Sequence, residues 1–215
     1  MRWVFLRCLP LIGLIWGVIG PVHTQGADFS SVEQLLDAVQ ERSAGISSFS
    51  SRFVQTRYLS IFPQPVKFSG QLTMARPDRL RWEFLEPVPS VLLLDGRQGM
   101  KCDGDAPPRV FNLDADPVMR MVARQLLAWT SGTYRDVREN FDFDLIPGPG
   151  LGFTPKAGGA ENVISRIEVI FEPETLQPLS VSINEPGGDH TLIVFAEYRE
   201  ITPSATLFNT CSTGP

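Results

Sequence analysis

The chain has few of the residues that bind metals, and it has no excess of basic residues. Of its 215 residues only two are His and three are Cys, and no Cys-x-x-Cys or Cys/His spacing is present. The sequence therefore predicts neither a metal site nor a cofactor. Lys and Arg sum to 19 against 24 Asp and Glu, which gives a net charge of −5. Nucleic-acid binding needs a basic surface, so we do not expect that class of partner.

An apolar run near the N-terminus is too short to cross a membrane. Two Arg residues precede it, and it extends from Leu9 to Ile19. About 11 residues fall well below the roughly 20 that a membrane-spanning helix needs. A basic start, a short apolar run and then small residues is the order found in a secretory signal peptide. We predict a signal peptide over residues 1–25, with an open cleavage point, and one periplasmic domain over residues 26–215.

Two cysteines, Cys102 and Cys211, follow the predicted signal peptide. An oxidising compartment permits a disulfide between them. The sequence does not show whether their Cα atoms come close enough, so a bonded pair and two free thiols both remain open.

Two segments have the apolar spacing of helices. The first extends from Ser30 to Arg42, and Ser30 with Glu33 is expected to form its capping box. The second begins at Asp116-Pro117 and ends at Gly132. Its predicted apolar stripe consists of Val118, Met121, Val122, Leu126 and Trp129.

Most of the remaining chain has the period-2 alternation of half-buried strands. Residues 68–74, 79–84, 141–146, 167–171 and 179–184 are predicted strands, and residues 191–198 are a further predicted strand that is apolar on both faces. Residues 101–108 and 147–159, which are rich in turn residues, are predicted to be loops. The apolar face of the early strands carries Leu72, Met74, Leu80, Trp82 and Phe84. Arg79 and Arg81 fall on the opposite face, which we expect to be solvated; the alternative is a cationic contact for a lipid headgroup or a partner.

This pattern predicts a mainly β (α+β) fold. One large antiparallel sheet twists and curls, and its apolar face must be covered. Two helices on the concave side would cover it. We therefore predict an incomplete antiparallel β-barrel with helices forming a lid over an apolar cavity.

The order of these elements resembles the LolA-type family of periplasmic outer-membrane lipoprotein carriers. The likeness rests on Phe53-Val54-Gln55-Thr56, on Ala75-Arg76-Pro77-Asp78-Arg79-Leu80-Arg81-Trp82 and on Leu93-Leu94-Asp95-Gly96, and it covers most of the chain after residue 26. The resemblance departs after Gly96, where Arg97-Gln98-Gly99-Met100 stands in place of the family's usual aromatic strand, and at the short polar C-terminus.

The resemblance implies a carrier that ferries acylated lipoproteins across the periplasm. It implies an inner-membrane ABC release complex as donor, an outer-membrane receptor as acceptor, and a monomer. Arg76 matches the family's gate arginine, which latches the lid in the closed, empty form. The strand residues Leu72, Met74, Leu80, Trp82 and Phe84, with the stripe of the second helix, become candidate lipid contacts. A paralogue for another lipid or glycolipid, and a lipid-binding sensor that does not transport, remain alternatives.

An enzyme is not expected. His190, Asp189 and Ser182 could form a triad on paper. However, no Gly-x-Ser-x-Gly elbow is present, and Asp189-His190 lies at a glycine-rich turn.

Overall fold

The computed structural model describes residues 29–158 and 160–211, and the predicted signal peptide lies outside these residues. The first half contains α1 (Val32–Ala44), β1 (Ser48–Tyr58), β2 (Val66–Ala75), β3 (Arg79–Glu86), β4 (Ser90–Asp95), β5 (Gln98–Asp103) and β6 (Arg109–Asn112). The second half contains α2 (Pro117–Ser131), the 3-10 helix η1 (Tyr134–Val137), β7 (Phe141–Ile146), β8 (Gly150–Pro155), β9 (Arg166–Phe171), β10 (Pro178–Asn184), β11 (His190–Glu200) and the 3-10 helix η2 (Ala205–Phe208).

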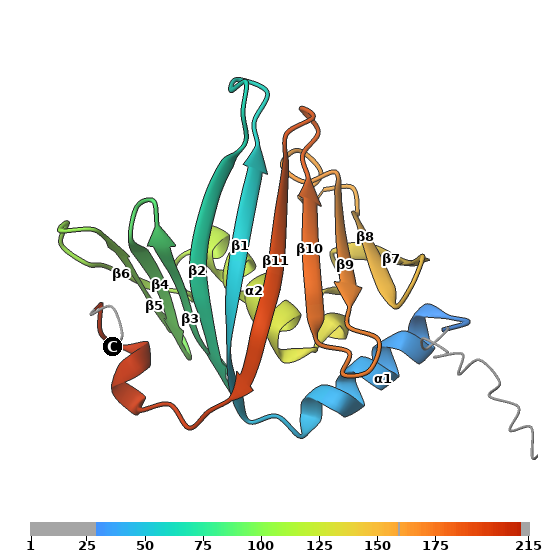
Figure 1. Ribbon diagram of the computed structural model, residues 1–215, viewed down its shortest axis with the longest axis horizontal. Helices are drawn as coiled ribbons and strands as arrows, with labels where there is room; N and C mark the ends of the chain where they lie inside the picture. The colour runs from blue at the N-terminus through green and yellow to red at the C-terminus, as the bar shows by residue number, and fades with distance from the viewer. Residues whose placement is uncertain (1–28, 159, 212–215) are drawn as a thin grey trace, which may run out of the picture.

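All the described strands belong to one antiparallel sheet, in the order β6-β5-β4-β3-β2-β1-β11-β10-β9-β8-β7. Each strand pairs with its neighbours in the chain, except that β6 does not pair with β7 and that β1 also pairs with β11. That pairing joins the two halves at the middle of the sheet. Strands β6 and β7 are the two edges, so the sheet curls without closing (Figure 1). The predicted fold class, an incomplete antiparallel barrel with helices, is confirmed.

The helices begin and end where the local chemistry requires. Ser31 is the N-cap of α1, and its hydroxyl accepts from the Gln34 N–H at 3.2 Å. The predicted capping box of Ser30 and Glu33 is therefore wrong by one residue, because the Glu33 carboxylate instead pairs with arginines of the following elements. The N-cap of α2 is the expected Asp116, which accepts from the Met119 N–H at 2.9 Å.

Gly132 ends α2, and the packing there leaves no space for a side chain. Its φ of +74° is in the left-handed region, and a Cβ at this position would lie 2.5 Å from the hydroxyl of Ser43. The ends of α1 and α2 therefore meet at this glycine.

The core lies between one face of the sheet and the two helices. Figure 1 shows α2 crossing behind the strands and α1 running below their ends. Leu35, Leu36 and Val39 of α1 and Trp129 of α2 belong to the same buried cluster as the sheet's inner face. Phe53 connects the strands within this cluster, because its ring packs against those of Trp82, Phe84 and Phe195.

Two predicted loops contain strands. Residues 150–155 form β8, although the Pro- and Gly-rich sequence predicted a loop over 147–159. Its glycines make room for neighbours: a Cβ on Gly152 would lie 2.3 Å from the guanidinium of Arg166, which crosses this strand to reach Asp144. The predicted turn over residues 101–108 is also partly wrong, since β5 continues to Asp103.

Candidate functional site

The space between the sheet and the helices is almost completely filled. A cavity of about 30 Å³ lies where α1, the end of α2 and the loop before β10 meet, and a smaller one of about 10 Å³ lies beside it. Together these have room for only a water molecule or two. Their walls are mainly apolar, and include Val39, Phe49, Leu72, Met74, Trp82 and Trp129. A ligand with a long acyl chain can enter only if the helices move away from the sheet.

Arg76 joins both helices to the sheet at the edge of this cavity. Its Nε donates to the carbonyl oxygen of Ile46 at 3.0 Å, and its Nη2 donates to those of Ser43 at 2.9 Å and Ser131 at 2.6 Å. These carbonyls belong to the end of α1, the segment that leads into β1, and the end of α2. One half-buried guanidinium on the β2–β3 turn therefore bonds to backbone at the ends of both helices.

A second set of contacts ties the helices to each other. Arg135 of η1, which follows α2, contacts the carboxylates of Glu33 at 3.2 Å and Asp37 at 2.7 Å on α1, and Arg138 also pairs with Glu33. The bonds from Arg138 and Arg135 hold the pKa of the Glu33 carboxyl below its ordinary value. The two helices, with η1, are therefore connected as one lid.

The structure places the predicted strand residues in the core. Leu72, Met74, Leu80 and Trp82 are almost fully buried, and Phe84 is half-buried. Of these, Leu72, Met74 and Trp82 face the two small cavities, whereas Leu80 and Phe84 pack elsewhere in the same cluster. The alternation of β2 and β3 therefore identified the correct face of each strand.

The predicted stripe of α2 is wrong at two positions. Val118 and Met121 are 65% and 42% exposed, and neither faces the cavities. Trp129 lies on both cavities, Leu126 packs against the core, and Val122 is half-buried. The buried side of the helix also carries Met119, Ala123 and Leu127, which the predicted stripe did not include. Val118 and Met121 have helical spacing with the rest of the stripe, but spacing alone does not show which side of the helix packs against the sheet.

Two tyrosines at the cavities were not predicted. The Tyr134 hydroxyl donates to the carbonyl of Trp129 at 3.0 Å, and the Tyr198 hydroxyl donates to that of Pro178 at 2.8 Å. Burial raises the pKa of both phenols. Tyr134 lies outside every predicted helix and strand, and Tyr198 ends the predicted strand over residues 191–198, where both faces are apolar and the pattern does not single it out.

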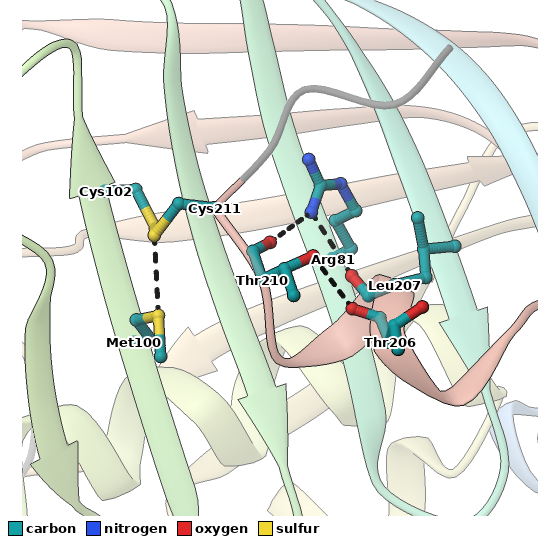
Figure 2. Close-up of a disulfide and its surroundings, with 7 residues drawn as sticks. All are labelled: Arg81, Met100, Cys102, Thr206, Leu207, Thr210 and Cys211. Carbon is teal, nitrogen blue, oxygen red and sulfur yellow. Dashed lines mark hydrogen bonds between the residues drawn. A yellow bond between two sulfur atoms is a disulfide. The ribbon is translucent and has the colours of Figure 1, made fainter.

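The opposite face of the sheet carries a covered arginine, which the sequence analysis assigned to a solvated surface. Arg81 is only 2% exposed and pairs with Glu83 at 2.9 Å. Figure 2 shows the C-terminal segment lying over it, with the Arg81 guanidinium donating to the carbonyls of Leu207 at 3.2 Å and Thr210 at 3.0 Å. We call this segment, residues 201–211, the C-terminal strap. The prediction of a solvated face is wrong at Arg81 because a distant part of the chain covers it.

A disulfide fastens the end of the strap. Cys102 of β5 bonds to Cys211, with their Cα atoms 5.8 Å apart (Figure 2). The sequence left this pairing open. In the strap, Phe208 is buried beneath the Arg79 guanidinium, which lies 5.2 Å from its ring centre.

Asp189, His190 and Ser182, which could form a triad by residue type, have other contacts in the structure. The Asp189 carboxylate accepts from the Ser60 N–H at 2.7 Å, and the His190 ring stacks on Tyr58 with their centres 4.1 Å apart. Ser182 lies on β10 in register with Leu192 of β11. Within residues 29–158 and 160–211, no group of three or more His, Cys, Asp or Glu side chains could hold a metal ion. No helix in this part of the chain is long and apolar enough to span a bilayer.

Comparison with known proteins identifies similar sequences. The family model described as outer membrane lipoprotein carrier protein LolA matches residues 44–211. The outer-membrane lipoprotein carrier protein of Dechloromonas aromatica is 24% identical over 186 residues, which cover 84% of this chain and 83% of the relative. The corresponding protein of Alkalilimnicola ehrlichii is 26% identical over 149 residues, which cover 69% of this chain and 65% of that relative.

A solved structure supports the fold alone. An uncharacterized conserved protein from Thermus thermophilus superposes with a TM-score of 0.53 at 10% sequence identity. The superposition covers 84% of this chain and 93% of that one.

Proposed function

The chain belongs to the family of the outer membrane lipoprotein carrier protein LolA, and on that premise we propose that it carries the acyl chains of lipoproteins across the periplasm. Residues 1–25 are proposed to direct its export. By the same premise it receives cargo from an inner-membrane ABC release complex and delivers it to an outer-membrane receptor. The carrier role needs apolar walls and a site that opens, and it needs no reacting group.

The energetics of acyl binding suit an apolar interior under a movable lid. Each buried CH₂ contributes roughly 0.8 kcal/mol, so a chain of about 14 methylenes contributes roughly 11 kcal/mol before any cost of opening. Binding of that strength would make release of the cargo slow unless closing of the empty carrier opposes it. The carrier therefore needs a closed form with favourable contacts of its own.

Arg76 is the observation that carries this proposal. Its three bonds to carbonyls of Ser43, Ile46 and Ser131 form only when both helices lie against the sheet. Hydrogen bonds from a charged donor contribute about 1.5–3 kcal/mol each. Cargo must break them on entry, and re-forming them on release offsets part of the lost acyl contact. We propose that Arg76 acts as this lid latch.

The proposed opening of the lid also identifies the residues that would contact the acyl chains. Opening of the lid would separate Trp129 and Leu126 of α2 from Leu72, Met74 and Trp82 of the sheet, all of which lie in the core cluster. Acyl chains would then take the place of the helix side chains, with Leu80 and Phe84 as further wall residues. Val118, Met121 and Val122 do not face the interior of the closed form, and we assign them no lipid contact.

The experiment is to identify the cargo. The tagged full chain is purified from the periplasm without detergent, and bound material is identified by mass spectrometry. Triacylated lipoproteins are the expected result, and N-terminal sequencing should place the mature start near residue 25. A free lipid or glycolipid would instead indicate a specialised paralogue. A protein that is empty under these conditions would contradict the carrier proposal and favour a sensor.

A further inference from the structure

The loop between β1 and β2 carries exposed apolar side chains and no charge. Residues 59–65 read Leu-Ser-Ile-Phe-Pro-Gln-Pro, and we call them the apolar tip. Ile61 is 79% exposed and Phe62 is 50% exposed. Figure 1 shows the β1–β2 hairpin extending beyond its neighbours, at the end of the sheet opposite α1. Large apolar side chains at the apex of a projection are not explained by packing within the chain.

The apolar tip is held in shape from below. The Phe62 N–H donates to the carbonyl of Leu59 at 2.9 Å, which closes a turn. The Ser60 N–H donates to the carboxylate of Asp189 at 2.7 Å on the β10–β11 turn. The Tyr58 ring, at the base of the tip, stacks on His190. Because these contacts and two prolines already restrict the loop, its ordering adds little cost when it binds a surface.

The same end of the sheet presents further apolar side chains. In an antiparallel sheet the β1–β2, β3–β4 and β8–β9 loops all lie at one end, and the β2–β3 turn with Arg76 lies at the other. Val88 of the β3–β4 loop and Val163 of the β8–β9 loop are 64% and 65% exposed. The apolar tip therefore projects from the end of the sheet that also exposes Val88 and Val163. Arg76 lies at the opposite end.

The chemistry of this end fits a lipid surface. A specific protein partner usually covers a broad patch of about 800 Å² on each side. A narrow projection with apolar residues at its apex can instead enter the bilayer interface without desolvating a charge. Its base carries Tyr58 and the Arg57–Glu185 ion pair, groups suited to the headgroup layer. Because residues 59–65 carry no charge and the whole chain has a net charge of −5, we do not expect attraction to anionic lipid to drive the contact.

We propose that the apolar tip inserts Ile61 and Phe62 into the interface of a lipid bilayer. The contact is weak and reversible, as for other small apolar anchors, and it does not depend on headgroup charge. It brings the carrier to a membrane independently of a protein receptor. This inference goes beyond the proposed carrier function and does not require that any cargo be bound.

The test is flotation of the full mature chain with vesicles of phosphatidylcholine and phosphatidylethanolamine. Replacement of both apex residues, Ile61→Ser with Phe62→Ser, should weaken the partition about tenfold or more, because two apolar side chains no longer enter the interface. The matched control replaces two equally exposed valines elsewhere, Val110→Ser with Val118→Ser. The control should float like the unaltered chain, and added salt should change neither result.

A second readout locates the contact. In the Phe62→Trp variant the new indole should be quenched by lipids with brominated acyl chains, with Val118→Trp as the control. Failure of the unaltered chain to float at millimolar lipid would overturn the proposal and leave a protein partner for the tip. Equal weakening by the control pair, or loss of binding in salt, would also overturn it. None of these results bears on cargo identification, which is carried out without membranes.

Discussion

Two arginines five residues apart hold two different segments onto opposite faces of the sheet. Arg76 donates to carbonyls of the lid helices on the inner side, and Arg81 donates to carbonyls of the C-terminal strap on the outer side. Both use a guanidinium against backbone oxygens, which needs no particular side chain on the covering segment. The surroundings of the two arginines nevertheless differ in every other respect.

The strap is fastened and the lid is only latched. Arg81 is almost fully buried, is paired with Glu83 and acts together with a disulfide. Arg76 is half-buried, and its side-chain bonds within the described residues go only to carbonyls. A buried ion pair is costly to break because either partner left alone remains a buried charge. The comparison predicts a permanent clamp at Arg81 and a releasable latch at Arg76, and the difference depends on burial and on a counter-charge.

The largest effect is expected at the clamp. Arg81→Met leaves Glu83 buried without its counter-charge, and it should lower the free energy of unfolding by about 3–5 kcal/mol. Urea unfolding measures this loss. The double variant Arg81→Met with Glu83→Leu should recover much of it, since neither charge is then left alone. A loss no greater than that of Arg79→Met, which removes the contact with Phe208, would show that the buried pair is not the clamp.

Removal of the disulfide should have the next largest effect. Cys102→Ser with Cys211→Ser releases a cross-link between residues 109 apart, and it should lower the free energy of unfolding by about 2–4 kcal/mol. Thermal unfolding of the oxidised and the reduced unaltered chain gives the same comparison without substitution. Because the strap lies on the outer face, bound cargo should be unchanged. A loss of cargo in the double variant would show that strap and lid are coupled.

The latch should affect delivery more than stability. Each charged bond of Arg76 contributes about 1.5–3 kcal/mol to the closed form. If the lid separates from the sheet before the sheet unfolds, however, the variant loses at most the free energy of lid closure. Arg76→Leu should therefore lower the free energy of unfolding by only about 1–2 kcal/mol. The variant should keep its cargo when it is mixed with outer-membrane vesicles, since closing no longer opposes binding. Arg97→Leu, an exposed arginine at the same end of the sheet, is the control. Normal delivery by Arg76→Leu would refute the latch.

The smallest effect is expected at the ion pairs between the helices. The bonds from Arg138 and Arg135 lower the pKa of the Glu33 carboxyl below 4.5. A lowered folded pKa adds stability that is present above the unfolded value and is lost as pH falls through the folded value. The difference in thermal midpoint between the unaltered chain and Glu33→Gln should therefore be small at pH 7, and it should shrink further as the pH falls below the ordinary pKa of the carboxyl and through its lowered folded value. A difference that persists at low pH would assign the effect to packing.

Local sequence predicted the elements well where short-range chemistry decides them. Asp116-Pro117 and Gly132 bounded α2, and alternation identified Leu72 and Trp82 as inner-face residues. Arg76 was reached only through family resemblance, because an arginine before a proline is ordinarily a solvated turn residue. The sequence missed β8, whose glycines look like loop residues until a neighbouring Arg166 requires the space beside them.

The sequence by itself determined both helices, most of the strands and which side of β2 and β3 is apolar, because these depend on neighbours within a few residues. Only the tertiary structure decided that Arg81 is buried, that Cys102 meets Cys211 and that Val118 and Met121 face outward. The first two depend on the strap returning across the sheet from the far end of the chain. The third depends on the angle at which α2 meets the strands. Both are set by the packing of distant segments, which no short pattern in the sequence records.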